Sequence, residues 1–172
     1  MVFEAYERVD GLWDLEGHLA DIKTYDVPLL DGVRPAGSPM HEMWIRVTVD
    51  NKQNIIEACG AMDAVPHWGS CETIAPDYAG LVGLNLMHGF RAAVRERFGN
   101  THRCTHVNEL INHLPTVAVQ AMWSRISAKE GRKPLPIDQC HAQTSDSEVV
   151  RRLYPQWYRA PRESEHPSEE ST

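Results

Sequence analysis

The first third of the chain alternates between apolar and polar residues, and this alternation restricts the folds open to it. In the stretch "LWDLEGHLADI", Trp13, Leu15 and Leu19 share one parity, whereas Glu16 and His18 share the other. Successive side chains of a β-strand point to opposite faces of a sheet. The pattern therefore predicts a strand with one buried face and one solvated face.

Neighbouring segments extend this strand into an antiparallel meander. The turn Asp10-Gly11 is a typical hairpin signal and pairs "FEAYERV" with the first strand. The segments "MHEMWIRVTVD" and "IIEACGAMDAV" read as two further strands, with a turn at residues 50–54 between them. "PLLDGVRPAGSP" is rich in proline and glycine, and we expect it to be a loop. The sequence thus predicts an antiparallel sheet of about four strands over residues 3–65.

Helical spacing replaces the alternation in the rest of the chain. Pro76 suits the first residue of a helix, and "GFRAAVRERF" is a short amphipathic run that Gly99 ends. From Cys104 to about Ile126 the apolar residues keep helical spacing, and we expect Pro115 to kink or split that helix. Strands followed by helices predict an α+β fold in which helices pack on one face of the sheet.

Length and charge limit the class of protein. The 172 residues suffice for a core, and we expect one domain over residues 1–159 and a disordered acidic tail over residues 160–172. The net charge of -7 argues against nucleic-acid binding. We expect no membrane span, because no apolar run is long enough, and a cytoplasmic protein, because the N-terminus lacks an export signal.

The stretch "LEGHLADIKTYD" gathers ionisable side chains within one predicted strand. Glu16 and His18 share a face, whereas Asp21 has the opposite parity unless Gly17 permits a bulge. A carboxylate beside a histidine fixes its tautomer and raises its basicity, which makes the minimal acid/base pair. The alternative is a solvated sheet face. The candidate acid/base residues of this stretch are Glu16, His18, Asp21, Lys23 and Tyr25.

His41 is the histidine that we expect to matter most for activity. It opens the strand "MHEMWIRVTVD" on the same parity as the apolar residues of that strand. A polar side chain on a buried parity needs a partner. His41 is therefore either a base or metal ligand at the rim of the sheet, or a core histidine bonded to the backbone.

Cysteines supply a second set of candidates. The four cysteines are far apart, form no CxxC pair, and are expected as free thiols or metal ligands. Cys71 lies at a strand-to-helix junction, and Cys104 and His106 open a predicted helix. Cys and His are the preferred zinc ligands. The alternative is that these cysteines are small buried apolar residues.

Long stretches of the chain resemble one bacterial family. "DGLWDLEGHLADIKTYD", "PMHEMWIRVTVDN", "RCTHVNEL" and "CHAQTSDSEVVRRLYPQWY" are similar to the stretches of domain of unknown function family 2889, and the resemblance extends to Tyr158. Members are frequent in bacteria that degrade aromatic compounds, which implies a role in the catabolism of lignin-derived aromatic compounds. The resemblance also implies that the ionisable stretch, His41 and the pair Cys140-His141 recur in the family; the sequence assigns no role to that pair.

Residues 40–125 are similar in order to the iron–sulfur cluster scaffold fold. In that fold three cysteines from two strand ends and a late helix converge on a metal. The similarity implies that His41, Cys71 and Cys104 converge here, with histidine at the first position. Glu42-Met43 replaces the Gly-Asp that follows it in that fold.

Three classes of function follow from these features. The first, to which we lean, is a small soluble enzyme of elimination or C–C lyase type that acts on a small aromatic substrate by acid/base chemistry, without an organic cofactor. The second is an enzyme that binds a single Zn or Fe ion through His41, Cys71, Cys104 and His106. The third is a non-catalytic metal or iron–sulfur carrier. A homodimer is left open.

Overall fold

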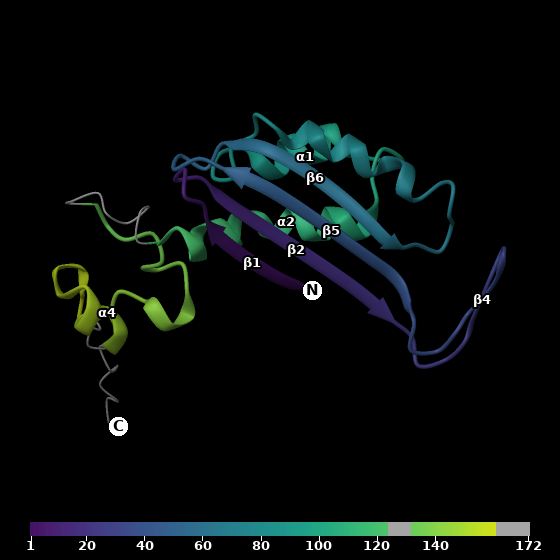
Figure 1. Cartoon of the computed structure of the whole chain (residues 1–172). Coiled ribbons are helices and arrows are strands. Elements are labelled where there is room, and N and C mark those ends of the chain that lie inside the picture. Colours follow the sequence, from purple (N-terminus) through teal and green to yellow (C-terminus); the bar gives the residue numbers. More distant parts are fainter. Residues whose placement is uncertain (124–131, 161–172) are drawn as a thin grey trace, which may run out of the picture. The chain divides into compact units, whose positions relative to one another are not determined.

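One antiparallel sheet forms the centre of the N-terminal part of the chain, as the alternation predicts (Figure 1). The strands lie in the order β1-β2-β5-β6, and each pairs with its neighbour in antiparallel register. Their bounds are Val2–Glu7, Trp13–Ile22, Pro39–Val49 and Ile55–Ala64, respectively. Together with the helices that follow, this sheet confirms the α+β fold class.

The computed structural model describes residues 1–123 and 132–160. The chain divides into two compact units, Met1–Arg125 and Ile126–Thr172. Of the tail expected over residues 160–172, only Ala160 lies among the described residues. The strands and the longer helices all belong to the first unit.

The connection between β2 and β5 contains a hairpin, which the loop expected over residues 28–39 did not include; residues 35–38 are irregular as expected. Two short strands, β3 (Val27–Leu29) and β4 (Gly32–Arg34), pair with each other and extend away from the main sheet (Figure 1). An isolated pair of this kind tolerates proline, because each of its two strands is an edge strand. The Arg34 guanidinium donates to the carbonyl of Val65 at 3.0 Å, which ties the hairpin to the segment after β6.

Helices cover one face of the sheet (Figure 1). The long helix α2 (Thr105–Ala121) packs on β1, β2 and β5, and it passes through Pro115 without the expected split. α1 (Phe90–Arg97) agrees with the expected amphipathic run. The helix expected to begin at Pro76 is instead a 3-10 helix, η1 (Glu72–Leu81), with Pro76 in its interior, and it packs on β6.

The core lies between the covered face of the sheet and α2. Side chains of one parity on β2 and β5 are almost fully buried, and so is the apolar face of α2. These core residues include Leu15, Leu19, Met43, Ile45, Val47, Leu110, Ile111 and Leu114. The opposite parity carries the polar residues, which confirms the half-buried strands expected from the alternation.

Tyr78 ties η1 to the beginning of α2. Its side chain is fully buried. The hydroxyl accepts a hydrogen bond from the Cys104 backbone N–H at 2.9 Å and donates to the Asn108 Oδ1 at 3.3 Å. The Asn108 amide in turn donates to the carbonyl of Phe98 at 3.1 Å. Burial raises the pKa of Tyr78 to about 12, so the hydroxyl stays protonated and continues to donate.

The second unit contains three short helices over its described residues. They are η2 (His141–Gln143), α4 (Glu148–Leu153) and η3 (Pro155–Trp157). The side chain of Ser147 caps α4 by accepting from the Val150 N–H at 3.2 Å. Cys140, which precedes η2, is exposed, and all four cysteines are free thiols.

Removal of the Tyr78 hydroxyl should destabilise the fold. In Tyr78→Phe the buried Asn108 and the Cys104 N–H each lose a partner, and we expect the free energy of unfolding to fall by about 1–3 kcal/mol. Urea denaturation measures this change. Tyr25→Phe is the matched control, because Tyr25 is 63% exposed. Equal stability losses in the two variants would contradict the role given to the buried hydroxyl.

Candidate functional site

A polar cluster lies at one end of the sheet face that the helices cover. It consists of Asp21, Lys23, His41 and His106, and we call it the histidine cluster. Asp21 and His41 lie directly opposite each other in the β2–β5 register. Their parity is that of the core residues Leu19 and Met43. Both side chains therefore point to the side of the sheet that the helices cover.

Asp21 binds both a lysine and a histidine. Its Oδ2 accepts from the His41 Nδ1 at 3.1 Å, and its Oδ1 accepts from the Lys23 ammonium at 2.7 Å. These bonds, that of Lys23 first and that of His41 second, hold the pKa of the Asp21 carboxyl below its ordinary value. The carboxylate therefore stays ionised, and it holds His41 in the tautomer whose Nδ1 carries the proton.

His106 joins this pair from the first turn of α2. Its ring stacks on the ring of His41, with centroids 3.9 Å apart and planes inclined by 28°. Burial lowers the pKa of His106, and the neighbouring His41 lowers it further, whereas Asp21 acts in the opposite direction. The neutral imidazole is thus favoured at this position.

The histidine cluster also has the composition of a metal site. One ligand atom each from Asp21, His41 and His106 can be chosen so that all three lie within 4.8 Å of one another. Among residues 1–123 and 132–160, they form the one such group of three. Two imidazoles and a carboxylate suit Zn²⁺ or Fe²⁺, and three protein ligands leave a position open for water or substrate.

The expected cysteine ligands lie outside this group. Cys104 is the N-cap residue of α2, and its Sγ lies 3.5 Å from the sulfur of Met43. Cys71 precedes η1, and its backbone N–H donates to the carbonyl of His67 at 2.9 Å. Of the four residues expected to bind metal, the structure thus brings His41 and His106 together, with Asp21 as their carboxylate neighbour.

Glu16 and His18 lie on the other face of the sheet. The register shift of β2 falls between Asp21 and Ile22, so no bulge at Gly17 moves Asp21 to their side. His18 stacks on Trp44 with centroids 3.8 Å apart, and its Nε2 lies 3.2 Å from the Glu42 Oε1. Its carboxylate partner therefore comes from β5 rather than from its own strand.

The structure thus places the six acid/base candidates of the sequence in three different locations. Asp21, Lys23 and His41 belong to the histidine cluster, Glu16 and His18 lie on the opposite face, and Tyr25 is exposed beyond the end of β2. Sequence reasoning missed the Asp21–His41 pair and the role of Glu42. The alternation of the strands could have indicated this pair, because Asp21 and His41 each have the same parity as the apolar residues of their own strand.

Comparison with known proteins shows the family of the chain. A family model described as protein of unknown function (DUF2889) matches residues 1–120, a range that includes the whole histidine cluster. The chain belongs to this family. No curated protein and no solved structure matches it. The similarity to the iron–sulfur scaffold fold therefore stays a prediction. Over the described residues, each helix is too short or too polar to cross a membrane.

The lowered pKa of His106 predicts how stability depends on pH. The folded chain takes up the proton on His106 below the ordinary pKa of 6.5, whereas the unfolded chain takes it up near that value. As the pH falls, the unfolded chain therefore binds this proton before the folded chain does. The free energy of unfolding that depends on His106 is at its full value above pH 6.5 and decreases as the pH falls through that value.

Replacement of His106 should remove this pH dependence. Urea denaturation between pH 5 and pH 8 should show a shallower pH slope for His106→Gln than for the natural chain. His88→Gln, a change at an exposed residue outside the cluster, is the control and should keep the original slope. An unchanged slope in His106→Gln would contradict the shift.

Proposed function

We propose that this protein is a small enzyme of elimination or C–C lyase type in which His41 is the general base. The hydrogen bond between Asp21 and the His41 Nδ1 is the observation that carries the proposal. In the neutral imidazole, a proton on Nδ1 leaves the lone pair on Nε2, which can take a proton from a substrate. Asp21 would also stabilise the imidazolium that forms, since Lys23 and His41 keep this carboxyl ionised.

A second proton-transfer group supports a lyase type of reaction. Cleavage of a C–C bond beside a hydroxyl needs a base for the hydroxyl proton and an acid that protonates the carbon left with the electron pair. An elimination similarly needs a base and an acid for the leaving group. His41, once it has taken the hydroxyl proton, would be the acid of the second step, and neutral His106, whose ring stacks on His41, would place a second nitrogen within reach of the substrate.

The substrate class in this proposal is a small aromatic compound. It rests on the resemblance to this family, whose members we expect in bacteria that degrade aromatic compounds; the description of the family itself names no substrate. We place the reaction in the cytoplasm and require no organic cofactor for it. A homodimer is compatible with this proposal, which does not depend on one.

A metal-dependent enzyme is the second candidate, and the three converging ligand atoms favour it. Asp21, His41 and His106 would hold a single Zn or Fe ion. The ion would supply a Lewis acid at its open position, while Lys23 would remain the neighbour of the carboxylate. A non-catalytic carrier would use the same three residues without turnover.

Turnover of aromatic compounds with and without a hydroxyl beside the scissile bond tests the enzyme. Product formation is followed by mass spectrometry. His41→Asn and Asp21→Asn should each lose about 10²-fold or more in kcat. His18→Asn is the matched control, because His18 also lies beside a carboxylate but on the other face. Full activity in a folded His41→Asn variant would sink the proposal for His41.

Metal analysis separates the two enzyme candidates and the carrier. Under the metal-dependent candidate, the purified protein binds one equivalent of Zn or Fe, His106→Gln loses most of it, and Cys71→Ser keeps it. A chelator would then abolish turnover, and added metal would restore it. Under acid/base chemistry alone, turnover persists in chelator. A carrier would bind metal and show no turnover with any substrate of the set.

A further inference from the structure

We infer that the space between α1 and α2 binds the phosphate or carboxylate group of a small molecule. This space, which we call the arginine pocket, has a volume of about 390 Å³. It is lined by Arg91, Val94, Arg95, Arg103, Asn108 and Asn112. Sites for small molecules in proteins have volumes of about 300–1,000 Å³, so the pocket accommodates a small metabolite.

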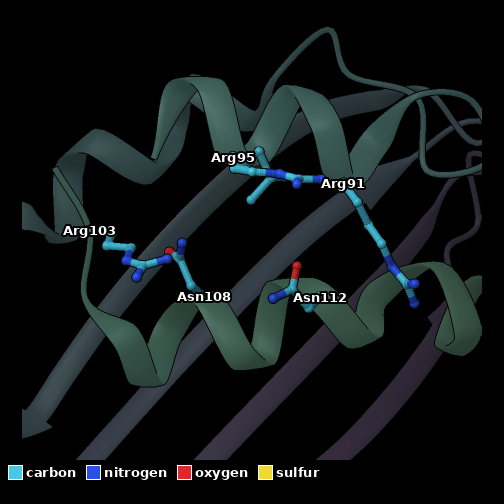
Figure 2. Close-up of a pocket in the computed structure, with 6 residues that line it drawn as sticks. Arg91, Arg95, Arg103, Asn108 and Asn112 are labelled. Atoms are coloured by element: carbon cyan, nitrogen blue, oxygen red, sulfur yellow. The ribbon is translucent and has the colours of Figure 1, made fainter. Parts of the chain in front are cut away.

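The two helices present matched pairs of polar side chains to this pocket (Figure 2). Arg91 and Arg95 are four residues apart on α1, and Asn108 and Asn112 are four residues apart on α2. Residues with this spacing lie on one face of a helix. Arg103, from the segment before α2, extends toward Asn108 and completes the lining (Figure 2).

Among the described residues, no carboxylate pairs with the three guanidinium groups of the pocket. Within the described parts of the chain, the guanidinium groups of Arg91, Arg95 and Arg103 form neither an ion pair nor a hydrogen bond. Arg97 of the same helix differs, because its guanidinium donates to the carbonyl of Gly80. The net charge of the chain is -7, so carboxylates are abundant elsewhere while this pocket has none in its lining.

Stability does not account for this arrangement. Like charges four residues apart on a helix destabilise the helix. An anion bound between Arg91 and Arg95 would remove this repulsion. Guanidinium groups bind phosphate and carboxylate through paired N–H donors, and such charge-assisted bonds are stronger than neutral ones.

The asparagines add donors and a fixed geometry. Asn108 is 6% exposed, and its amide orientation is set by Tyr78 on the oxygen and Phe98 on the nitrogen. The Asn112 amide makes no hydrogen bond to the described residues, so its N–H₂ is available to a ligand. Val94 supplies an apolar contact for the remainder of the molecule. The overall acidity of the chain disfavours a nucleic acid as the anion.

Titration with sodium phosphate and with sodium succinate tests the inference on the full chain. Isothermal calorimetry and thermal unfolding are carried out at pH 7.5 against sodium chloride of equal ionic strength. We expect saturable binding of one equivalent and a rise in Tm with at least one of the two anions. Binding of phosphate alone would assign a phosphoryl ligand, and binding of succinate alone would assign a carboxylate ligand.

Charge-removing variants locate the binding. The double variant Arg91→Gln and Arg95→Gln should weaken anion binding by about tenfold or more. Arg103→Gln, outside both helices, should weaken it as well and serves if the double variant fails to fold. Arg152→Gln removes one exposed positive charge from α4 and should bind as the natural chain does.

Two results would overturn the inference. One is the absence of saturable binding of either anion beyond the effect of chloride. The other is unchanged affinity in the folded Arg91/Arg95 and Arg103 variants. His18→Asn should bind the anion normally, because His18 lies on the opposite face of the sheet and does not line the arginine pocket.

Discussion

The register between β2 and β5 is the constraint on which both the core and the site depend. It places Leu19 opposite Met43 and Gly17 opposite Ile45 within the core, and it places Asp21 opposite His41 at the end of the same face. Because side chains alternate along a strand, a slip of one residue would move one partner of each pair to the other face. The burial of the apolar residues thus fixes that Asp21 and His41 lie opposite each other, and their hydrogen bond then joins the two side chains.

Parity and helical spacing were sufficient to predict most of the fold. The main strands, their antiparallel pairing and the helices on one face all follow from where apolar residues recur, because a large buried surface enforces those periods. The β3–β4 hairpin could not be predicted in this way. It buries little, Leu30 and Val33 at and beside its turn are exposed, and its prolines indicated a loop. η1 also differed from the expectation: it begins at Glu72, before Pro76, and it packs on β6, a contact that its local pattern does not contain.

The candidate site was only partly predictable, because contacts between strands do not appear in the order of the chain. His41 stood out on its own strand through its apolar parity. Its partner Asp21 was grouped with Glu16 and His18, which are near it in sequence and lie on the opposite face. His106 was expected beside cysteines, whereas the structure places it against His41. A pairing across strands or between a helix and a sheet depends on register and packing, and one sequence contains neither.

The first turn of α2 contributes residues to both the histidine cluster and the arginine pocket. His106 on this turn faces the end of the sheet, and Asn108, two residues later, lines the arginine pocket. Tyr78 holds both Cys104 and Asn108. A ligand that displaced this turn would therefore act on both the histidine cluster and the arginine pocket. By thermodynamic reciprocity, any ligand that moves the turn from one side changes the affinity on the other side by the same factor that the second ligand imposes on the first.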